Sequence, residues 1–182
     1  ILGLSAMSYM RCSVWQNSEV LWSDVIDKYP NAAPVAHNNR GTFYRDKGQP
    51  DKAIKDFNTA ISLKNDYHLA YNNRGNVYFS RQQNDKALAD YNKVLSLEPD
   101  NAKAYCNRGA VYFQQGKYAE GIADATKALA LQPIYPDAMI NRAVLYSVTN
   151  QHEAAKKDYD NYLRYRPNNH QAYNWRGLAY RH

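Results

Sequence analysis

A three-residue motif, Asn-Arg-Gly, returns along this 182-residue chain at a constant spacing of 34 residues. It stands at 39–41, 73–75 and 107–109, and continues with one substitution each as Asn-Arg-Ala at 141–143 and Trp-Arg-Gly at 175–177. A tyrosine follows the last residue of each motif by three positions. A fixed period of this length predicts a chain of stacked units, because one such unit cannot bury its own apolar face.

Two further sets of residues recur with this period, and we call each set, taken at the same place in successive repeats, a column. A small residue follows the motif by twelve positions, and an aspartate follows it by fifteen. The small-residue column contains Ala53, Ala87, Gly121 and Ala155. The aspartate column contains Asp56, Asp90, Asp124 and Asp158. Small residues in register on two helices allow the backbones to approach closely, so each unit is expected to be a pair of crossing helices.

The 34-residue period with this small–aromatic–small pattern resembles the tetratricopeptide repeat family, whose unit is a helix-turn-helix. The resemblance implies an all-α fold, a right-handed superhelical α-solenoid whose concave face is lined by the first helix of each unit. Residues 34–182 are expected to hold four repeats, 34–67, 68–101, 102–135 and 136–169, and a partial one, 170–182. First helices are expected at 34–47, 68–81, 102–115, 136–149 and 169–181. Second helices are expected at 50–64, 84–98, 118–131 and 152–165.

Repeat positions are numbered below so that Pro34, His68, Ala102, Pro136 and His170 each occupy position 1. Glycines 48 and 116, at position 15, are expected to end first helices with positive φ.

Arginine at position 7 is expected to pair with aspartate at position 23, since a half-buried charge needs a partner. The predicted structural ion pairs are Arg40–Asp56, Arg74–Asp90, Arg108–Asp124 and Arg142–Asp158. Arg176 is expected to lack an aspartate partner, because no member of the aspartate column follows it in this sequence.

The resemblance places a peptide-binding groove on the first helices, at positions 2, 5, 6, 9, 12 and 13. The candidate groove residues are Asn38, Asn39, Asn72, Asn73, Asn76, Phe79, Lys103, Asn107, Phe113, Gln114, Asn141 and Asn174. Primary amides both donate and accept, so a column of them is suited to the backbone of an extended peptide. Cys106 is expected to line the same groove.

The asparagines at position 6 resemble the asparagine ladder in the repeat domain of O-linked N-acetylglucosamine transferase. The alternative is that these amides bond only to a neighbouring helix. A carboxylate clamp for chaperone C-termini would need Lys and Arg at positions 5 and 9. Those positions hold Asn38, Thr42, Asn72, Asn76, Cys106 and Ala110, which argues against a clamp.

Residues 1–33 repeat less clearly. Residues 18–29 have the pattern of a second helix, with Asn17 as N-cap, and the uncharged stretch 1–10 is either the end of a membrane span or part of a degenerate first repeat. The spacing of Arg11, Trp15, Trp22 and Pro30 resembles the junction in bacterial polytopic membrane proteins of a transmembrane-and-tetratricopeptide, mannosyltransferase-like kind. That resemblance implies a tether to the membrane through the N-terminus and a location in the bacterial cell envelope, on the periplasmic side of the inner membrane. The alternative location is cytoplasmic.

The last helix carries apolar residues on several sides, Tyr173, Trp175, Leu178 and Tyr180. This suggests either that the chain is truncated here or that the helix docks on another copy to form a homodimer.

No catalytic, metal-binding or cofactor-binding pattern is present in the sequence. The net charge of +6 does not indicate nucleic-acid binding, because the lysines alternate with aspartates such as Asp51 and Asp85. The expected function is therefore a non-catalytic module that binds a protein or peptide in its concave groove. The alternatives are a structural assembly scaffold and an accessory domain of a membrane glycosyltransferase-like protein.

Overall fold

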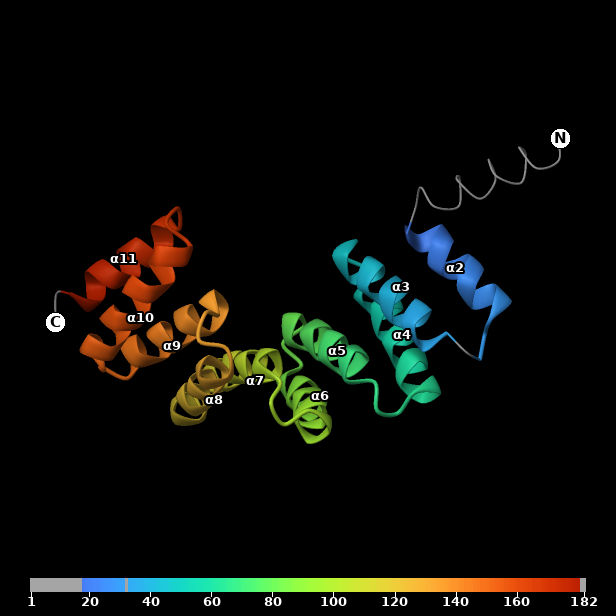
Figure 1. The fold of residues 1–182 in the computed structure, drawn as a ribbon, viewed down its shortest axis with the longest axis horizontal. Helices are drawn as coiled ribbons and strands as arrows, with labels where there is room; N and C mark the ends of the chain where they lie inside the picture. The colour runs from blue at the N-terminus through green and yellow to red at the C-terminus, as the bar shows by residue number, and fades with distance from the viewer. Residues whose placement is uncertain (1–17, 32, 181–182) are drawn as a thin grey trace. The chain divides into compact units, whose positions relative to one another are not determined.

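The structure, a computed structural model, describes residues 18–31 and 33–180, and every regular element in these ranges is a helix (Figure 1). The helices are α2 (Ser18–Lys28), α3 (Pro34–Asp46), α4 (Pro50–Leu63), α5 (His68–Ser80), α6 (Asn84–Leu97), α7 (Ala102–Gln114), α8 (Tyr118–Leu131), α9 (Pro136–Val148), α10 (His152–Tyr165) and α11 (His170–Ala179). The predicted all-α class is confirmed for these residues, and the helices from α3 to α10 begin and end within one residue of their expected positions.

Several expectations fall outside the described residues. They are the N-cap role of Asn17, the two alternatives for residues 1–10, and the junction residues Arg11 and Trp15. The last helix, expected at 169–181, instead runs from His170 to Ala179 and is followed by Tyr180 as its C-cap.

Helix starts follow local sequence signals. Proline occupies the first turn of α3, α4 and α9, where its missing N–H removes no helical hydrogen bond. The side chains of Asn101 and Asn169 cap α7 and α11 by accepting hydrogen bonds from the backbone N–H groups of Ala104 and Ala172, at 2.9 and 3.0 Å. These caps satisfy donors that the helices leave without an internal partner.

The turn after each first helix uses a left-handed residue at position 15. Gly48 and Gly116 have φ of 67° and 73°, as predicted, and Gln82 and Asn150 adopt 58° and 59° at the equivalent places. The turn geometry is therefore kept even where the sequence does not supply glycine.

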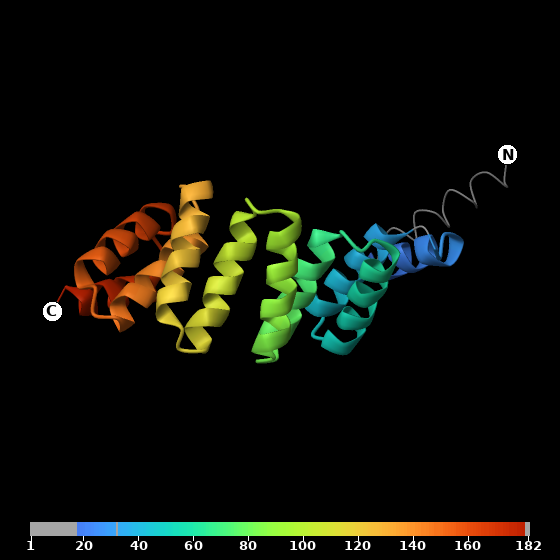
Figure 2. The same cartoon turned by 90° about the horizontal axis from the view of Figure 1, so that it is seen from below.

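The described residues fall into two compact units, one up to residue 82 and the other from residue 83 onward. In the first unit α2 packs on α3, α3 pairs with α4, and α4 contacts α5. In the second unit the helices from α6 to α11 each contact the next one along the chain, as the two views show for α7 and α8 (Figures 1 and 2). First helices also contact one another directly, α3 with α5 and α7 with α9. Stacking of first helices within each unit is what the groove prediction requires.

Three helix pairs, α3–α4, α7–α8 and α9–α10, cross at small residues. A Cβ on Gly41 would lie 2.7 Å from Cε1 of Phe57, and one on Gly109 would lie 3.2 Å from the backbone oxygen of Gly121. In the pair α9–α10 the same crossing is made by Ala143 and Ala155, both fully buried with Tyr159. The predicted close approach of first and second helices is thus present in these three pairs.

No helix among the described residues combines the length and the apolar character that crossing a bilayer requires.

Candidate functional site

The arginine at position 7 holds the aspartate at position 23 with two parallel hydrogen bonds. Nε and Nη2 of Arg108 both lie 2.7 Å from the two carboxylate oxygens of Asp124. Arg40 reaches Asp56 at 2.8 Å through each nitrogen, and Arg142 reaches Asp158 at 2.6 and 2.8 Å. These three predicted ion pairs are confirmed, and they are of the bidentate kind that gives arginine–carboxylate pairs their strength. The carboxylate hydrogen bond is also the main cause that raises the pKa of Arg40, Arg108 and Arg142 above its usual value.

The first of these pairs has an additional member. Nδ1 of His37 lies 3.2 Å from Oδ1 of Asp56, and both side chains are buried. The fourth predicted pair, Arg74 with Asp90, would join residues of different units and stays a prediction.

The third arginine nitrogen, Nη1, binds back to the preceding second helix. It donates to Ser23 from Arg40, to Asn58 from Arg74, to Asn92 from Arg108, to Thr126 from Arg142 and to Asp160 from Arg176. The expectation that Arg176 lacks an aspartate partner is therefore wrong: its Nη1 lies 2.7 Å from Oδ1 of Asp160. The aspartate column alone does not identify these partners. Their signal in the sequence is a hydrogen-bonding side chain sixteen or seventeen positions before each arginine.

The same arginines stack on tyrosines. The guanidinium carbon of Arg108 lies 5.5 Å from the ring centre of Tyr105 and 5.7 Å from that of Tyr112. Arg176 lies 5.2 Å from Tyr173 and 5.9 Å from Tyr180 in the same way. Much of the tyrosine content, 17 of 182 residues, thus serves cation–π contacts with one column of arginines.

In the first unit the groove amides bond to one another. Nδ2 of Asn73 donates to Oδ1 of Asn38 at 3.0 Å, and Nδ2 of Asn38 donates to Oδ1 of Asn39 at 3.3 Å. Asn38 and Asn72 are only 5% exposed, so little of either side chain is left for a ligand. Asn39, Asn73, Asn76 and Phe79 are half-buried and remain candidate groove residues.

In the second unit Lys103, Phe113, Gln114 and Asn174 are exposed, and Asn107 and Asn141 are half-buried. Nδ2 of Asn141 lies 3.4 Å from Sγ of Cys106. Asn73 and Asn141 both occupy position 6, and each donates an amide N–H to the side chain at position 5 of the preceding first helix. This arrangement matches the neighbouring-helix alternative for the asparagine column, while leaving each Oδ1 as an acceptor.

Cys106 is not a groove-lining residue as expected, because it is 3% exposed. Burial raises the pKa of its thiol to about 11, and the hydrogen bonds from Tyr135 and Asn141 oppose that shift only partly. A thiol of this kind is protonated at neutral pH and is a poor nucleophile. Within residues 18–31 and 33–180 no cluster of His, Cys, Asp and Glu is arranged to hold a metal ion.

A cavity of about 300 Å³ lies beside Trp175, the residue that replaces asparagine at position 6 of the last repeat. It is formed by α9, α10 and α11 and lined by Ser147, Asn150, His152, Tyr159, Trp175, Leu178 and Ala179. The hydroxyl groups of Ser147 and Tyr159 lie 3.2 Å apart at this wall, and Leu178 is 56% exposed. An apolar hollow with a few polar groups is the usual form of a site for a side chain or small ligand.

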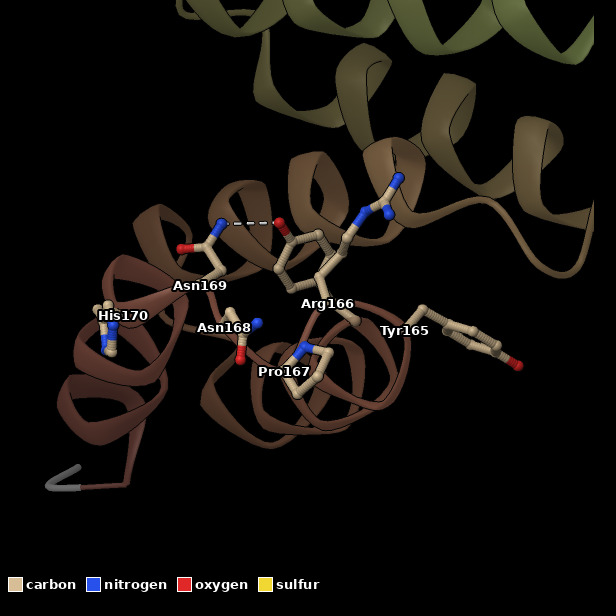
Figure 3. A pocket seen from close by; sticks show the side chains of 7 residues that line it. Tyr165, Arg166, Pro167, Asn168, Asn169 and His170 are labelled. Atoms are coloured by element: carbon tan, nitrogen blue, oxygen red, sulfur yellow. Dashed lines mark hydrogen bonds between the residues drawn. The ribbon is translucent and has the colours of Figure 1, made fainter.

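Two hollows of another kind lie at loops that join repeats. The one between α10 and α11, about 580 Å³, is drawn in Figure 3, where Arg166, Pro167 and Asn168 follow the loop and Asn169 donates to the hydroxyl of Tyr162 at 2.7 Å. A hollow of about 730 Å³ occupies the same place before α7. Because the same loop produces both, we attribute them to the repeat architecture.

Comparison with known proteins agrees with this architecture. Family models described as TPR repeat and tetratricopeptide repeat match residues 41–80, 75–116, 102–135 and 140–182. Among proteins of curated function no match was found.

Solved structures similar to this chain are also repeat proteins. A tetratricopeptide repeat protein from Parabacteroides merdae has a TM-score of 0.76 at 22% identity, covering 98% of this chain and 70% of its own. A TPR protein of Thermus thermophilus has a TM-score of 0.73 at 20% identity, covering 98% and 95%. The first TPR of Spaghetti (RPAP3), solved with the HSP90 peptide SRMEEVD, has a TM-score of 0.61 at 32% identity, covering 63% and 90%.

Successive family models thus match most of the region from 41 to 182, and the helix pairs, the small-residue crossings and the glycine-type turns recur there at one period. This chain belongs to the tetratricopeptide repeat family, whose members are generally non-catalytic protein-interaction modules.

Proposed function

We propose that this chain binds an extended peptide or a partner helix along its first helices, with one apolar side chain of the ligand seated beside Trp175. The observation that carries the proposal is the cavity of about 300 Å³ at Trp175 and Leu178. Its volume suits one large apolar side chain, and the paired hydroxyls of Ser147 and Tyr159 offer a polar contact at its wall.

The groove amides supply the second part of the interaction. In the second unit Asn141 uses Nδ2 within the protein, so its Oδ1 serves as an acceptor for an N–H group of a bound backbone. Such contacts do not depend on the side chains of the ligand. Selectivity therefore falls to the Trp175 cavity and to the exposed Phe113, which packs near Tyr118 with ring centres 6.0 Å apart.

The ligand is not an acidic C-terminus of the HSP90 type. The related repeat domain was solved with the peptide SRMEEVD, but positions 5 and 9 of this chain hold amides and small or apolar residues such as Asn72, Asn76 and Ala110. Because positions 5 and 9 offer no cation to pair with carboxylates, we expect SRMEEVD to bind at least about tenfold more weakly than a peptide selected on this chain.

The test is selection of peptides from a displayed library on the immobilised chain, followed by calorimetric titration of the best binder. We expect Leu178→Asp to reduce its affinity by tenfold or more, because a carboxylate would then stand at the mouth of the apolar cavity. Ile134→Ser is the matched control, since Ile134 is 57% exposed but lies in the loop before α9. Equal affinity of both variants, or a selected peptide that lacks apolar residues, would contradict the proposal.

We also propose, on the resemblance of residues 11–30 alone, that the module works in the bacterial cell envelope on the periplasmic side, tethered through its N-terminus. The test is fractionation of cells that express the native gene, followed by protease treatment of spheroplasts. Protection of the chain until the membrane is lysed would contradict this location.

A further inference from the structure

The first turns of α7 and α9 lie together in the second unit, because one apolar cluster joins them. Ala102 at the start of α7 and Ala138 at the start of α9 both pack in the cluster around Cys106. The two helices also contact one another directly. The side chains next to these alanines, Lys103 and Asp137, both occupy position 2 of their repeats. They therefore leave neighbouring helices at the same end of the groove.

The carboxylate of Asp137 lies on the side of α9 that is near α7. Burial is the main cause that raises the pKa of Cys106, and the charge of Asp137 raises it further. Since the interaction between two charges falls with their distance, an aspartate that acts on a residue of α7 in this way lies close to that helix. Lys103 stands three positions before Cys106 on the same helix.

Neither of these two charges is used within the part of the chain that the structure describes. Both side chains are exposed, and neither forms an ion pair with a described residue. The acidic residues just before Lys103 bond to other partners. Glu98 accepts a hydrogen bond from Asn101 at 2.7 Å, and Oδ1 of Asp100 lies 3.9 Å from Nζ of Lys127. A cation in the first turn of a helix is also opposed by the helix dipole, so Lys103 occupies its position at a cost to α7.

We propose that Lys103 and Asp137 select a peptide with charges of both signs, an acidic residue opposite Lys103 and a basic residue about three positions away opposite Asp137. Neighbouring packed helices lie about 8–10 Å apart. A chain in the polyproline II conformation advances about 3.1 Å per residue and turns every third side chain to the same side. Two such side chains therefore span α7 and α9. The inference rests on the proposed function and names the class of ligand that the groove of the second unit takes.

The amide of Asn141 supplies the backbone contact between the two charges. Asn141 stands four positions after Asp137, and residues four apart are neighbours on the same side of a helix. Its Nδ2 lies 3.4 Å from Sγ of Cys106, so Oδ1 is oriented before any ligand binds and accepts a backbone N–H. Exposed ion pairs contribute little by themselves. A backbone hydrogen bond beside them holds the ligand in the register at which both charges are matched.

The experiment compares the parent chain with an exchange variant, Lys103→Asp combined with Asp137→Lys, which keeps the net charge. Peptides from a displayed random library are selected on each immobilised chain. The best binders are titrated by calorimetry at about 50 mM salt, where exposed charges are weakly screened. We expect the peptides selected on the parent chain to share an acidic and a basic residue about three positions apart in one fixed order. Peptides selected on the exchange variant should carry the two in the reverse order.

The best peptide from the parent chain should bind the exchange variant at least about tenfold more weakly, because two attractions become two repulsions. The same peptide with its acidic and basic residues exchanged should regain that affinity. Salt of about 500 mM should remove most of the difference. Lys93→Glu is the matched control for Lys103→Glu, since Lys93 is exposed on the second helix α6. Only Lys103→Glu should weaken the binding of the parent peptide.

Three results would overturn the inference, and they separate it from the proposed function. Equal affinity of the parent peptide for the parent chain and the exchange variant, together with its loss in Leu178→Asp, would leave peptide binding in place and remove the charge selection. Equal losses in Lys93→Glu and Lys103→Glu would show a general charge effect instead of a site. A selection that yields no peptide with measurable affinity for the parent chain would overturn the proposed function and this inference with it.

Discussion

Both carboxylate oxygens of Asp158 are held by Arg142, at 2.6 Å from Nε and 2.8 Å from Nη2. The aspartate side chain is 4% exposed and the arginine side chain 20%. A carboxylate this deeply buried is tolerated because the guanidinium satisfies it with two directed hydrogen bonds. Because the same arginine also reaches Thr126 in the preceding second helix, one side chain connects three helices.

Replacing Arg142 with methionine should destabilise the protein by roughly 3 kcal/mol, because Asp158 would remain buried without its partner. The free energy of unfolding in urea measures the change. Replacing both residues, Arg142→Met with Asp158→Leu, should recover most of the loss, since the uncompensated charge is then gone. Arg164→Met is the control, because Arg164 is exposed on α10. A single-variant loss no larger than that of the control would contradict the structural role of the pair.

Gln82 is expected to be a site where glycine stabilises the protein. Its φ of 58° places a side chain in the left-handed region, which disfavours residues other than glycine by about 1 kcal/mol. Part of that gain is offset by the greater freedom of glycine in the unfolded chain. We therefore expect Gln82→Gly to raise Tm by roughly 1–3 °C in a calorimetric scan.

Asn150, at the same position of a later repeat, has a φ of 59° and provides the comparison. Asparagine tolerates this conformation better than glutamine, so Asn150→Gly should change Tm less than Gln82→Gly does. A lower Tm for Gln82→Gly would mean that this turn does not hold the left-handed conformation in solution.

Repeat period alone predicted most of the fold. Position 8 and position 20 are small in every repeat that has both, and helix crossings such as Gly41 against Phe57 and Gly109 against Gly121 follow from that requirement. The left-handed turns at Gln82 and Asn150 were not predicted, because neither residue is glycine. The repeat pattern therefore predicts how the helices pack, whereas the identity of the residue at position 15 predicts the left-handed turn only where that residue is glycine.

The candidate site was less predictable. The position of an asparagine in the repeat predicts which face of the first helix it occupies, but not whether its amide already bonds within the protein. The burial of Asn38 and Asn72 was therefore not predicted. The backward bond from Arg176 to Asp160 was missed for a similar reason, since it joins neighbouring repeats whose relative position depends on packing. The Trp175 cavity is formed where side chains of three helices meet, so no local sequence pattern predicts it.

The asparagine column can be tested through Asn73. Its Nδ2 donates to Oδ1 of the buried Asn38 at 3.0 Å, so Asn73→Ala leaves that oxygen without this donor. We expect the protein to lose about 1–2 kcal/mol of stability in urea unfolding. Asn174→Ala, at an exposed site, should have little effect. Unchanged stability of Asn73→Ala combined with lost affinity for the selected peptide would instead favour a ligand-binding ladder.

Cys106 should make the protein less stable at alkaline pH. Burial raises the pKa of its thiol from 9.0 to about 11, so the folded state keeps a proton that the unfolded state releases. Below pH 9 the thiol is protonated in both the folded and the unfolded state, so Cys106 adds no pH dependence to the free energy of unfolding. Between pH 9 and 11 the unfolded state binds fewer protons, and stability therefore falls as the pH rises.

The loss attributable to this thiol should approach about 2 kcal/mol near pH 11, since each pKa unit corresponds to roughly 1.4 kcal/mol. Urea unfolding of the parent chain and of Cys106→Ala at pH 8 and pH 10.5 measures the effect of the thiol together with the part of the raised pKa of Tyr135 that Cys106 causes. A tyrosine whose raised pKa has other causes, such as Tyr159, contributes equally to both proteins. The stability difference between the two proteins should narrow as the pH rises. A difference that stays constant over this range would show that the thiol titrates alike in the folded and unfolded chain, and that the site around Tyr135 and Asn141 admits water.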